Sequence, residues 1–393
     1  MEALRLVWDE AFTGYDFGDE HPMHPIRLEL TARLATDLGL LDAAGVHVVS
    51  AEPPDDELLL SVHDADYIEA VRRASTRPVV SDLKFGLGST DNPTFPGMHE
   101  ASGRICAASR EVALAVWSGQ AEHGVNFTGG MHHAMPAAAS GFCVYNDIGV
   151  AIQALLDAGA KRVAYVDVDV HHGDGVEKIF WDDPRVLTIS LHENGRVLFP
   201  GTGFPEDLGG DAAQGTAVNV ALPPGTSDAG WLRAFHSVVP SLLEAFEPEV
   251  LVTQQGCDSH VLDPLAHLAL SLDCQRASYE ALHEFAHRYA GGRWVAFGGG
   301  GYEIVDVVPR AWSHLIGIAA HRPIPPGTDV PAGWREYVNA RCGRPAPQRM
   351  TDGANTDYRS WSTGYDPADA IDRVVLATRK AVFPLHGLDP YFD

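Results

Sequence analysis

Short apolar runs that favour β-strands alternate along this chain with longer segments of helical period, and this alternation restricts the fold more than any other feature. Residues 163–166 are apolar on both faces, which is typical of a strand buried between layers of helices. The pattern predicts an α/β single domain with a mostly parallel central sheet, helices on both faces, and an active site at the carboxyl ends of the strands. The expected strands cover 124–128, 162–170, 186–191, 218–222, 249–255 and 293–297, and the expected helices cover 101–118, 147–158, 228–245, 275–289 and 303–320.

The chain changes character after Ala320. Stretches that contain proline, glycine and arginine follow, with one short helical pattern at about 368–378. We expect residues 1–320 to form the catalytic domain and residues 321–393 to form a C-terminal extension packed on the same domain.

Charge and composition exclude several classes of function. The formal net charge is −25, which disfavours nucleic acid as a partner and is compatible with cationic partners such as lysine-bearing peptides or polyamines. No long apolar run predicts a membrane span or a signal region, so we expect a cytoplasmic protein without a membrane partner. The five cysteines form no C-x-x-C pair, which leaves histidine and carboxylate as ligands for any metal. The oligomeric state is not readable from the sequence.

The strongest chemical signal is the run 165–175, in which acidic residues and histidines end a buried strand. Side chains two apart on a strand share a face, so Asp167, Asp169 and His171 are expected to project to the same side. Ionisable groups are costly in an apolar environment unless they are paired or bind a cation. We therefore interpret them as ligands or as partners of catalytic groups.

A second carboxylate, Asp258, follows the apolar run 249–255. Taken alone it is typical of a turn, and only the first motif makes it a candidate ligand. With Asp169 and His171 it makes a three-ligand set with an open position, the arrangement of a catalytic zinc. Iron(II) is an alternative, because this ligand set discriminates poorly between the two metals. His260 and Asp263 nearby receive no separate role.

Two adjacent histidines, His132 and His133, follow a short strand and a Gly-Gly pair. Histidine is the natural general acid or base near neutral pH, and Asp167 and Asp174 are available to orient the two imidazoles. A second metal site and a pair of loop histidines without a role are the alternatives.

Four glycines at 298–301 precede Tyr302. No Gly-Lys-Ser/Thr sequence follows them, so a phosphate cradle is disfavoured. Tyr302 is better interpreted as a hydrogen-bond donor to a developing oxyanion.

These elements, in this order, resemble the histone-deacetylase-like branch of the arginase/deacetylase superfamily, from about Asp9 to about Ala320. The segments 21–27, 141–143 and 199–203 belong to the same resemblance. The segments 15–22 and 91–97 and the long tail look most like bacterial acetoin-utilisation-type deacetylases.

The resemblance implies roles residue by residue. It implies Asp169, His171 and Asp258 as metal ligands, and His132, His133, Tyr302, Asp167 and Asp174 as catalytic residues. It implies Phe142, Phe199, Leu265 and Gly300 around the substrate, Arg27 in an acetate channel, and a structural potassium ion at Asp167, Asp169, His171, Ser190 and Leu191. Family members that act on proteins carry an aspartate at the pocket rim, and the alignment places His99 or Glu100 there.

The implied activity is that of a zinc-dependent amidohydrolase that removes acetyl groups from lysine side chains of proteins, releasing acetate, in acetoin or acetate metabolism. An acetylpolyamine or other small acetyl-amide is the alternative substrate, and a non-catalytic acetyl-lysine binding module is a further alternative. A binuclear manganese hydrolase of the arginase type is disfavoured by Tyr302. Which of His132 and His133 is the general base stays open.

Overall fold

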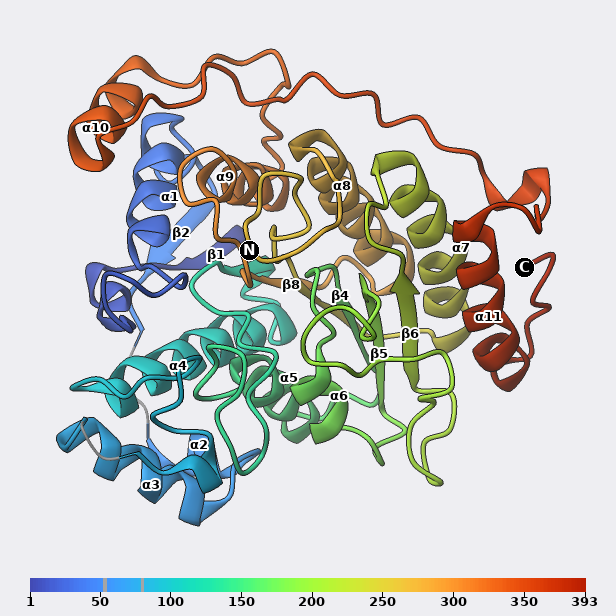
Figure 1. Ribbon diagram of the computed structural model, residues 1–393, viewed down its shortest axis with the longest axis horizontal. Helices are drawn as coiled ribbons and strands as arrows, with labels where there is room; N and C mark the ends of the chain where they lie inside the picture. The colour runs from blue at the N-terminus through green and yellow to red at the C-terminus, as the bar shows by residue number, and fades with distance from the viewer. Residues whose placement is uncertain (52–54, 79–80) are drawn as a thin grey trace.

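A single eight-stranded, all-parallel sheet forms the centre of the molecule (Figure 1). The computed structural model describes residues 1–51, 55–78 and 81–393. The strand order is β2-β1-β3-β8-β7-β4-β5-β6, which confirms the predicted parallel α/β architecture. The strands are β1 (Glu2–Val7), β2 (Val46–Val49), β3 (Ala121–Asn126), β4 (Val163–Asp167), β5 (Val186–Glu193), β6 (Ala217–Leu222), β7 (Val250–Gln254) and β8 (Trp294–Phe297).

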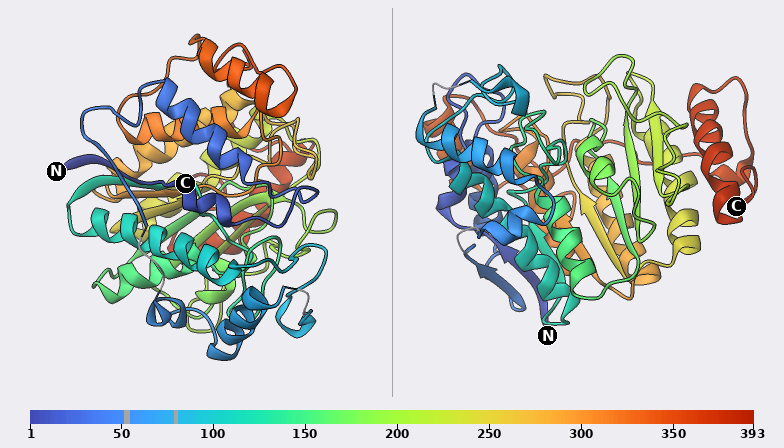
Figure 2. Two further views of the ribbon diagram at one scale, coloured as in Figure 1. Left: turned by 90° about the vertical axis from the view of Figure 1, so that its left-hand side faces the viewer. Right: turned by 90° about the horizontal axis from the view of Figure 1, so that it is seen from below.

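Helices cover both faces of the sheet (Figure 2). α4 and α5 pack together on one face, while α1, α9, α8 and α7 follow one another across the other. The central strands β4 and β7 are buried at every position, as a sheet between two helical layers requires. The α-helices are α1 (Ile26–Asp37), α2 (Asp56–Leu60), α3 (Ala65–Thr76), α4 (Met98–Trp117), α5 (Asp147–Asp157), α6 (Asp174–Ile179), α7 (Asp228–Phe246), α8 (Leu272–Tyr289), α9 (Val308–Ala319), α10 (Ala332–Cys342) and α11 (Ala370–Val382). Short 3₁₀ helices lie at Glu10–Gly14, Leu83–Phe85, Trp361–Thr363 and Phe383–His386.

The register of the strands places their polar carboxyl ends in one row. Asp167 of β4 lies opposite Ser190 of β5 on one side and Gln254 of β7 on the other. Gln254 in turn pairs with Phe297 of β8, which pairs with Asn126 of β3. Because all five strands run in the same direction, the segments that follow them emerge at one edge of the sheet.

The N-terminal third contains elements that the periodicity did not predict, namely β1, β2, α1, α2 and α3. β2 is a half-exposed edge strand, so it lacks the apolar faces of a central strand. β1 carries Arg5, which is only 8% exposed and pairs with Glu2 and Glu111. A buried charge neutralised by a residue 106 positions away has no signature in local sequence.

The C-terminal segment runs from α10, which packs on α1, across the helices of one face to α11 (Figure 1). α11 contacts α7 and β6, where Asp372 pairs with the buried guanidinium of Arg233. Midway, Asp352 accepts hydrogen bonds from His260 and Arg310. The boundary at residue 320 itself stays a prediction. Within the described residues, the helices are all too short or too polar to cross a membrane.

Candidate active site

A cavity of about 210 Å³ opens at the carboxyl edge of the sheet. Its lining combines two histidines with aromatic and aliphatic side chains, so an apolar passage leads to groups that can do chemistry. The lining residues are Asp91, His133, Gly141, Phe142, His171, Leu198, Phe199, Leu265 and Tyr302.

At the base of this cavity lie Asp169, His171 and Asp258, whose ligand atoms are all within 4.8 Å of one another. His171 Nδ1 is 3.1 Å from Asp169 Oδ1 and 3.1 Å from Asp258 Oδ2. Both carboxylates are fully buried, and two buried carboxylates that converge on one point are stable only with a compensating positive charge. Two oxygens and one nitrogen beside an open cavity fit a catalytic divalent metal.

The end of β7 and the loops after β4 and β8 hold these carboxylates through amide and backbone donors. Asp169 Oδ2 accepts from the Gln254 side chain at 2.7 Å and from Gly300 N at 2.8 Å, and Asp258 Oδ1 accepts from Val170 N at 2.9 Å. A Cβ atom on Gly300 would lie 1.9 Å from Asp258 Oδ2, so only glycine fits there. Gly300 therefore supports the ligand set instead of lining the cavity.

One part of the strand-face argument is wrong. β4 ends at Asp167, and residues from 168 onward are irregular, so the alternation of a strand does not place Asp169 and His171. Instead, the backbone N–H groups of Asp169 and His171 each donate to the carboxylate two residues earlier. These short local turns bring the three side chains together.

Each histidine of the pair has its own carboxylate partner. His132 Nδ1 lies 2.8 Å from Asp167 Oδ2, and His133 Nδ1 lies 2.6 Å from Asp174 Oδ1. Since a carboxylate only accepts, both imidazoles carry hydrogen on Nδ1, which leaves Nε2 for the cavity side. Asp167 Oδ2 also accepts from the buried Tyr165 hydroxyl at 2.6 Å.

The two imidazoles differ in basicity. Burial lowers the pKa of His132, but the charges of Asp167 and Asp169 outweigh it and raise the pKa to about 9. Burial, together with the neighbouring charge of His132, lowers the pKa of His133 to about 4 despite Asp174. The pair therefore holds one protonated and one neutral ring at pH 7.

Two aromatic rings form the walls of the cavity. Phe142 adopts a left-handed backbone conformation with φ 67°, and its carbonyl accepts from the Tyr15 hydroxyl at 2.6 Å. Phe199 is 43% exposed and sits edge-on to His133 at a centroid distance of 5.0 Å. Leu265 completes the rim of this apolar passage.

Tyr302 meets Phe142 edge-on at 5.7 Å and faces the same cavity. Burial and the charges of Asp258 and Asp169 raise the pKa of its hydroxyl well above the ordinary value, so the group stays a proton-bearing donor. The Asp263 carboxylate accepts from Tyr302 N at 2.9 Å and from Leu265 N at 3.0 Å. Asp263, left without a role by the sequence, thus joins two residues of the cavity.

Arg27 is buried behind the site. Its guanidinium donates to the carbonyls of Gly299 and Gly301 at 2.9 and 3.2 Å and lies over Trp312. It also borders a small internal cavity of about 10 Å³. Of the two remaining residues predicted for potassium, Ser190 bonds His192 through its hydroxyl and Leu191 is fully buried.

His99 and Glu100, which the alignment places at the pocket rim, are not among the residues that line the cavity. Both residues lie in the first turn of α4, where His99 bonds the Tyr145 hydroxyl and Glu100 accepts from Ser75. Asp91, upstream in the same loop region, lines the cavity instead. Asp91 lies in an irregular segment, so no helix or strand period predicts that its side chain reaches the cavity.

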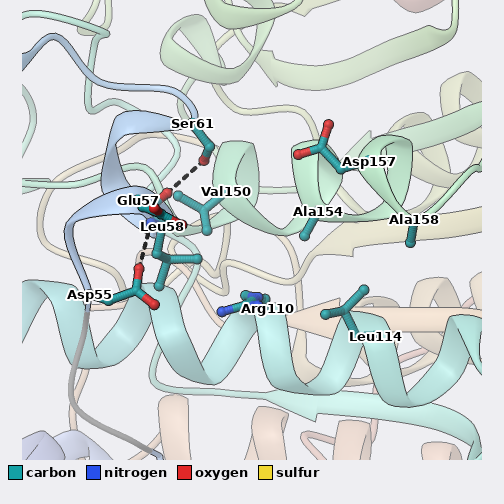
Figure 3. A pocket seen from close by; sticks show the side chains of 10 residues that line it. All are labelled: Asp55, Glu57, Leu58, Ser61, Arg110, Leu114, Val150, Ala154, Asp157 and Ala158. Carbon is teal, nitrogen blue, oxygen red and sulfur yellow. Dashed lines mark hydrogen bonds between the residues drawn. The ribbon is translucent and has the colours of Figure 1, made fainter.

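A larger hollow of about 380 Å³ lies between α2, α4 and α5, where Leu114 and Ala154 point toward the gap (Figure 3). Its polar lining consists of Asp55, Glu57, Ser61, Arg110 and Asp157, a mixture of charges whose described members include no histidine or cysteine. Size alone therefore does not make it the reactive site.

Comparisons with known proteins agree with this geometry. The histone deacetylase domain matches residues 21–319. The acetoin utilization protein AcuC of Bacillus subtilis (strain 168) is 38% identical over 352 residues, covering 89% of this chain and 90% of the relative. AcuC of Staphylococcus aureus (strain MRSA252) is 38% identical over 360 residues, covering 91% and 92%. A crystal structure of an HDAC homolog complexed with SAHA superposes with a TM-score of 0.83 at 27% identity, covering 96% of this chain and 99% of that one. The chain is therefore a deacetylase of the histone deacetylase family.

Proposed function

We propose that this deacetylase uses a zinc ion, held by Asp169, His171 and Asp258, to remove the acetyl group from acetylated lysine side chains of proteins. The observation that carries the proposal is the apolar passage between Phe142 and Phe199, which ends at the ligand set. A lysine side chain has four methylene groups and one polar end, and such a passage matches both parts.

When bound, the metal would polarise the acetyl carbonyl and acidify a water molecule. His133 then takes a proton from that water at Nε2, because its Nδ1 hydrogen is donated to Asp174. His133, unlike His132, lines the cavity, and its lowered pKa leaves the ring neutral and able to accept a proton. The same nitrogen returns the proton to the departing amine. His132 donates its Nδ1 hydrogen to the buried Asp167 carboxylate, which favours a protonated ring that supplies positive charge beside the reacting centre.

Tyr302 donates its hydroxyl hydrogen to the oxygen of the acetyl group as negative charge develops there. Its raised pKa keeps the donor protonated through the working range of pH. Asp263 fixes the backbone on which this hydroxyl is carried, so we assign it a positioning role.

Asp91 at the rim favours protein substrates over small amines. An acidic side chain at the mouth of the passage can accept hydrogen bonds from the backbone N–H groups that flank an acetyl-lysine. In this proposal the activity serves acetoin utilisation, which is supported by the similarity to AcuC over most of both chains. A structural potassium ion at the end of β4 accompanies the proposal, since Ser190 lies opposite Asp167 in register.

The test measures acetate release from an acetyl-lysine peptide and from an acetylated polyamine in parallel, by protein stripped of metal and reloaded with Zn²⁺. We expect chelator-sensitive release that is at least about tenfold faster, in kcat/KM, from the peptide. Faster release from the polyamine would assign the enzyme to small-molecule metabolism. Binding of the peptide without release of acetate from either substrate would identify a binding module.

The Asp91→Ala variant, which removes both carboxylate acceptors where asparagine would keep one, sharpens the assignment. Loss of a rim acceptor raises KM for the peptide by roughly tenfold and leaves kcat unchanged, because the contact is made equally in ground and transition states. A small uncharged acetyl-amide has neither a flanking backbone N–H nor a positive charge for Asp91 to bind, so its kinetics stay as in the wild type and serve as the control. Equal losses for both substrates would overturn the role of Asp91.

A further inference from the structure

A second group of histidines lies outside the active site, at the other end of the sheet. Four imidazoles from three separate parts of the fold converge so closely that one nitrogen of each lies within 4.8 Å of all the others. We call this group the histidine cluster; its members are His123, His283, His287 and His321.

His123 is the buried anchor of the histidine cluster. It lies in β3, in register with Trp294, the first residue of β8, and so near the amino ends of the strands. Its Nδ1 is 2.7 Å from the carbonyl of Ala319, and since a carbonyl only accepts, Nδ1 carries the hydrogen. Nε2 therefore presents a lone pair, yet this atom is buried and has no hydrogen-bond partner within the described structure.

An unpartnered buried acceptor is unfavourable, and here it is surrounded by three further imidazoles. The rings of His321, His283 and His287 lie 4.8, 4.9 and 5.2 Å from the ring of His123. Histidine ligands of metals commonly donate their second ring hydrogen to a backbone carbonyl, which is the arrangement of His123.

The other three members come from elements that aim them inward. His283 and His287 are one turn apart on α8, and their Nε2 atoms are 3.2 Å from each other. His321 follows α9 in a left-handed conformation, φ 55°, a position where glycine is usual. This backbone conformation turns the His321 ring toward α8, at centroid distances of 5.1 and 5.7 Å.

Acidic residues contribute only at the margin of the cluster. Glu122 accepts from His321 Nε2 at 3.1 Å and lies 3.9 Å from His287 Nε2. No carboxylate contacts His123 or His283 among the hydrogen bonds and ion pairs of the described residues. Burial lowers the pKa of both rings, to about 4 for His123 and about 3 for His283, so both are neutral at pH 7.

We propose that the histidine cluster is a second metal site, which binds a divalent cation with a preference for imidazole nitrogen, such as Zn²⁺. Up to four nitrogens converge there, as in tetrahedral zinc sites or in tetragonal copper and nickel sites. The side chains of His287 and His321 are 36% and 38% exposed, which gives an ion from solvent access to the buried lone pair of His123.

The site is structural in this proposal. A bound cation would tie the start of β3 to α8 and to the segment that follows α9, three parts of the chain up to 198 residues apart. The active-site ligands follow β4 and β7 at the opposite ends of the strands, so the two sites load independently.

The experiment counts zinc in untagged, full-length protein that has been stripped with a chelator and dialysed against buffered Zn²⁺. We expect about two zinc ions per wild-type chain and about one in Asp258→Asn, which loses only the active-site ion. Addition of His283→Asn and His321→Asn to Asp258→Asn removes the remaining ion. His47→Asn, an exposed histidine outside the cluster, is the matched control and retains it.

Asparagine suits position 321 because it tolerates the left-handed backbone. In the Asp258→Asn background, saturating Zn²⁺ raises the melting temperature by roughly 3 °C, and His321→Asn alone abolishes that shift. Zinc-free Asp258→Asn protein, or a remaining ion that survives the His283 and His321 changes, would overturn the proposal. A wild type with one ion that Asp258→Asn removes would leave the proposed active site intact and refute the histidine cluster alone.

Discussion

Strand β3 connects two groups of histidines in opposite electrostatic surroundings. Beyond its carboxyl end, His132 and His133 each bond a buried carboxylate. Near its amino end, His123 faces three other imidazoles and no carboxylate among its described contacts. A carboxylate partner fixes the tautomer and lets a ring carry or exchange a proton, whereas neutral imidazoles that face one another leave a lone pair, such as that of His123 Nε2, available to a cation.

The pKa values of His132 and His123 follow this difference. At the carboxyl end, nearby carboxylates overcome the effect of burial and raise the pKa of His132 to about 9. At the amino end, burial and the neighbouring imidazoles lower the pKa of His123 to about 4. Burial also lowers the pKa of His133, at the carboxyl end, to about 4. Similar burial thus has opposite outcomes for His132 and His123, and the charges of the neighbours decide which ring is protonated at pH 7.

The largest expected effect locates the chemistry at the carboxyl end. Tyr302→Phe removes one donor to the developing oxyanion and should lower kcat by roughly 10²–10³-fold with little change in KM. The measurement is acetate release at saturating substrate. Tyr289→Phe, at the end of α8 near the histidine cluster, is the matched control and should stay within about twofold of the wild type. Near-normal turnover of Tyr302→Phe would remove this tyrosine from the mechanism.

The next effect tests the carboxylate partner. Asp174→Asn keeps the shape of the side chain but loses the charge that orients and supports His133, and we expect kcat to fall by roughly 10–100-fold. Zinc content should be unchanged, since Asp174 is not among the candidate ligands. Glu122→Gln makes the same change beside the histidine cluster and should leave kcat alone. An equal fall in kcat in the two variants would contradict the proposed difference between the two ends of the sheet.

Local sequence predicts one end of the sheet far better than the other. Asp167, Asp169 and His171 are spaced closely after an apolar run, and the structure brings Asp169 and His171 to Asp258 at the predicted edge. The parallel sheet follows from the same runs, because strands buried on both faces leave a clear apolar signature. The local turns that orient Asp169 and His171 leave no such signature in the sequence. They depend on hydrogen bonds that form only after β4 ends at Asp167.

What escaped prediction depends on contacts between distant residues. Asp91 reaches the cavity through an irregular loop, and Asp263 gains its partner Tyr302 only through folding. In the histidine cluster, the spacing of His283 and His287 is the sole local signal, while His123 lies 160 residues upstream of His283. Convergence over such separations is a property of topology and is absent from any window of sequence.

A smaller effect appears on acidification of metal-free protein. The pKa values of His123 and His283 are lower in the folded state than the ordinary value near 6.5, so the unfolded chain binds more protons between about pH 6.5 and 4. Stability contributed by the neutral rings is present above that range and is lost as the pH falls through it. His283 is partly exposed, so its share is on the order of 1 kcal/mol between pH 7 and 5.

Urea unfolding in chelator at the two pH values measures this share. His283→Gln should lose less stability on acidification than the wild type, whereas His47→Gln should match the wild type. At the carboxyl end the pH dependence of stability has the opposite sign. The raised pKa of His132 gives stability below about pH 6.5 that is lost as the pH rises toward 9. If His283→Gln loses as much stability on acidification as the wild type, the histidine cluster does not lower the pKa of His283.

The smallest expected effect is on catalysis by changes in the histidine cluster. His283→Asn combined with His287→Asn should leave kcat and KM within about twofold, because the cluster and the ligand set lie at opposite ends of the strands and share no described hydrogen bond. The assay is acetate release by zinc-loaded protein below its melting temperature, so that any loss of stability is kept apart from turnover. A fall in kcat of about tenfold would show that β3 and β8 transmit changes along their length. In that case the amino-end histidines would regulate the deacetylase instead of only stabilising its fold.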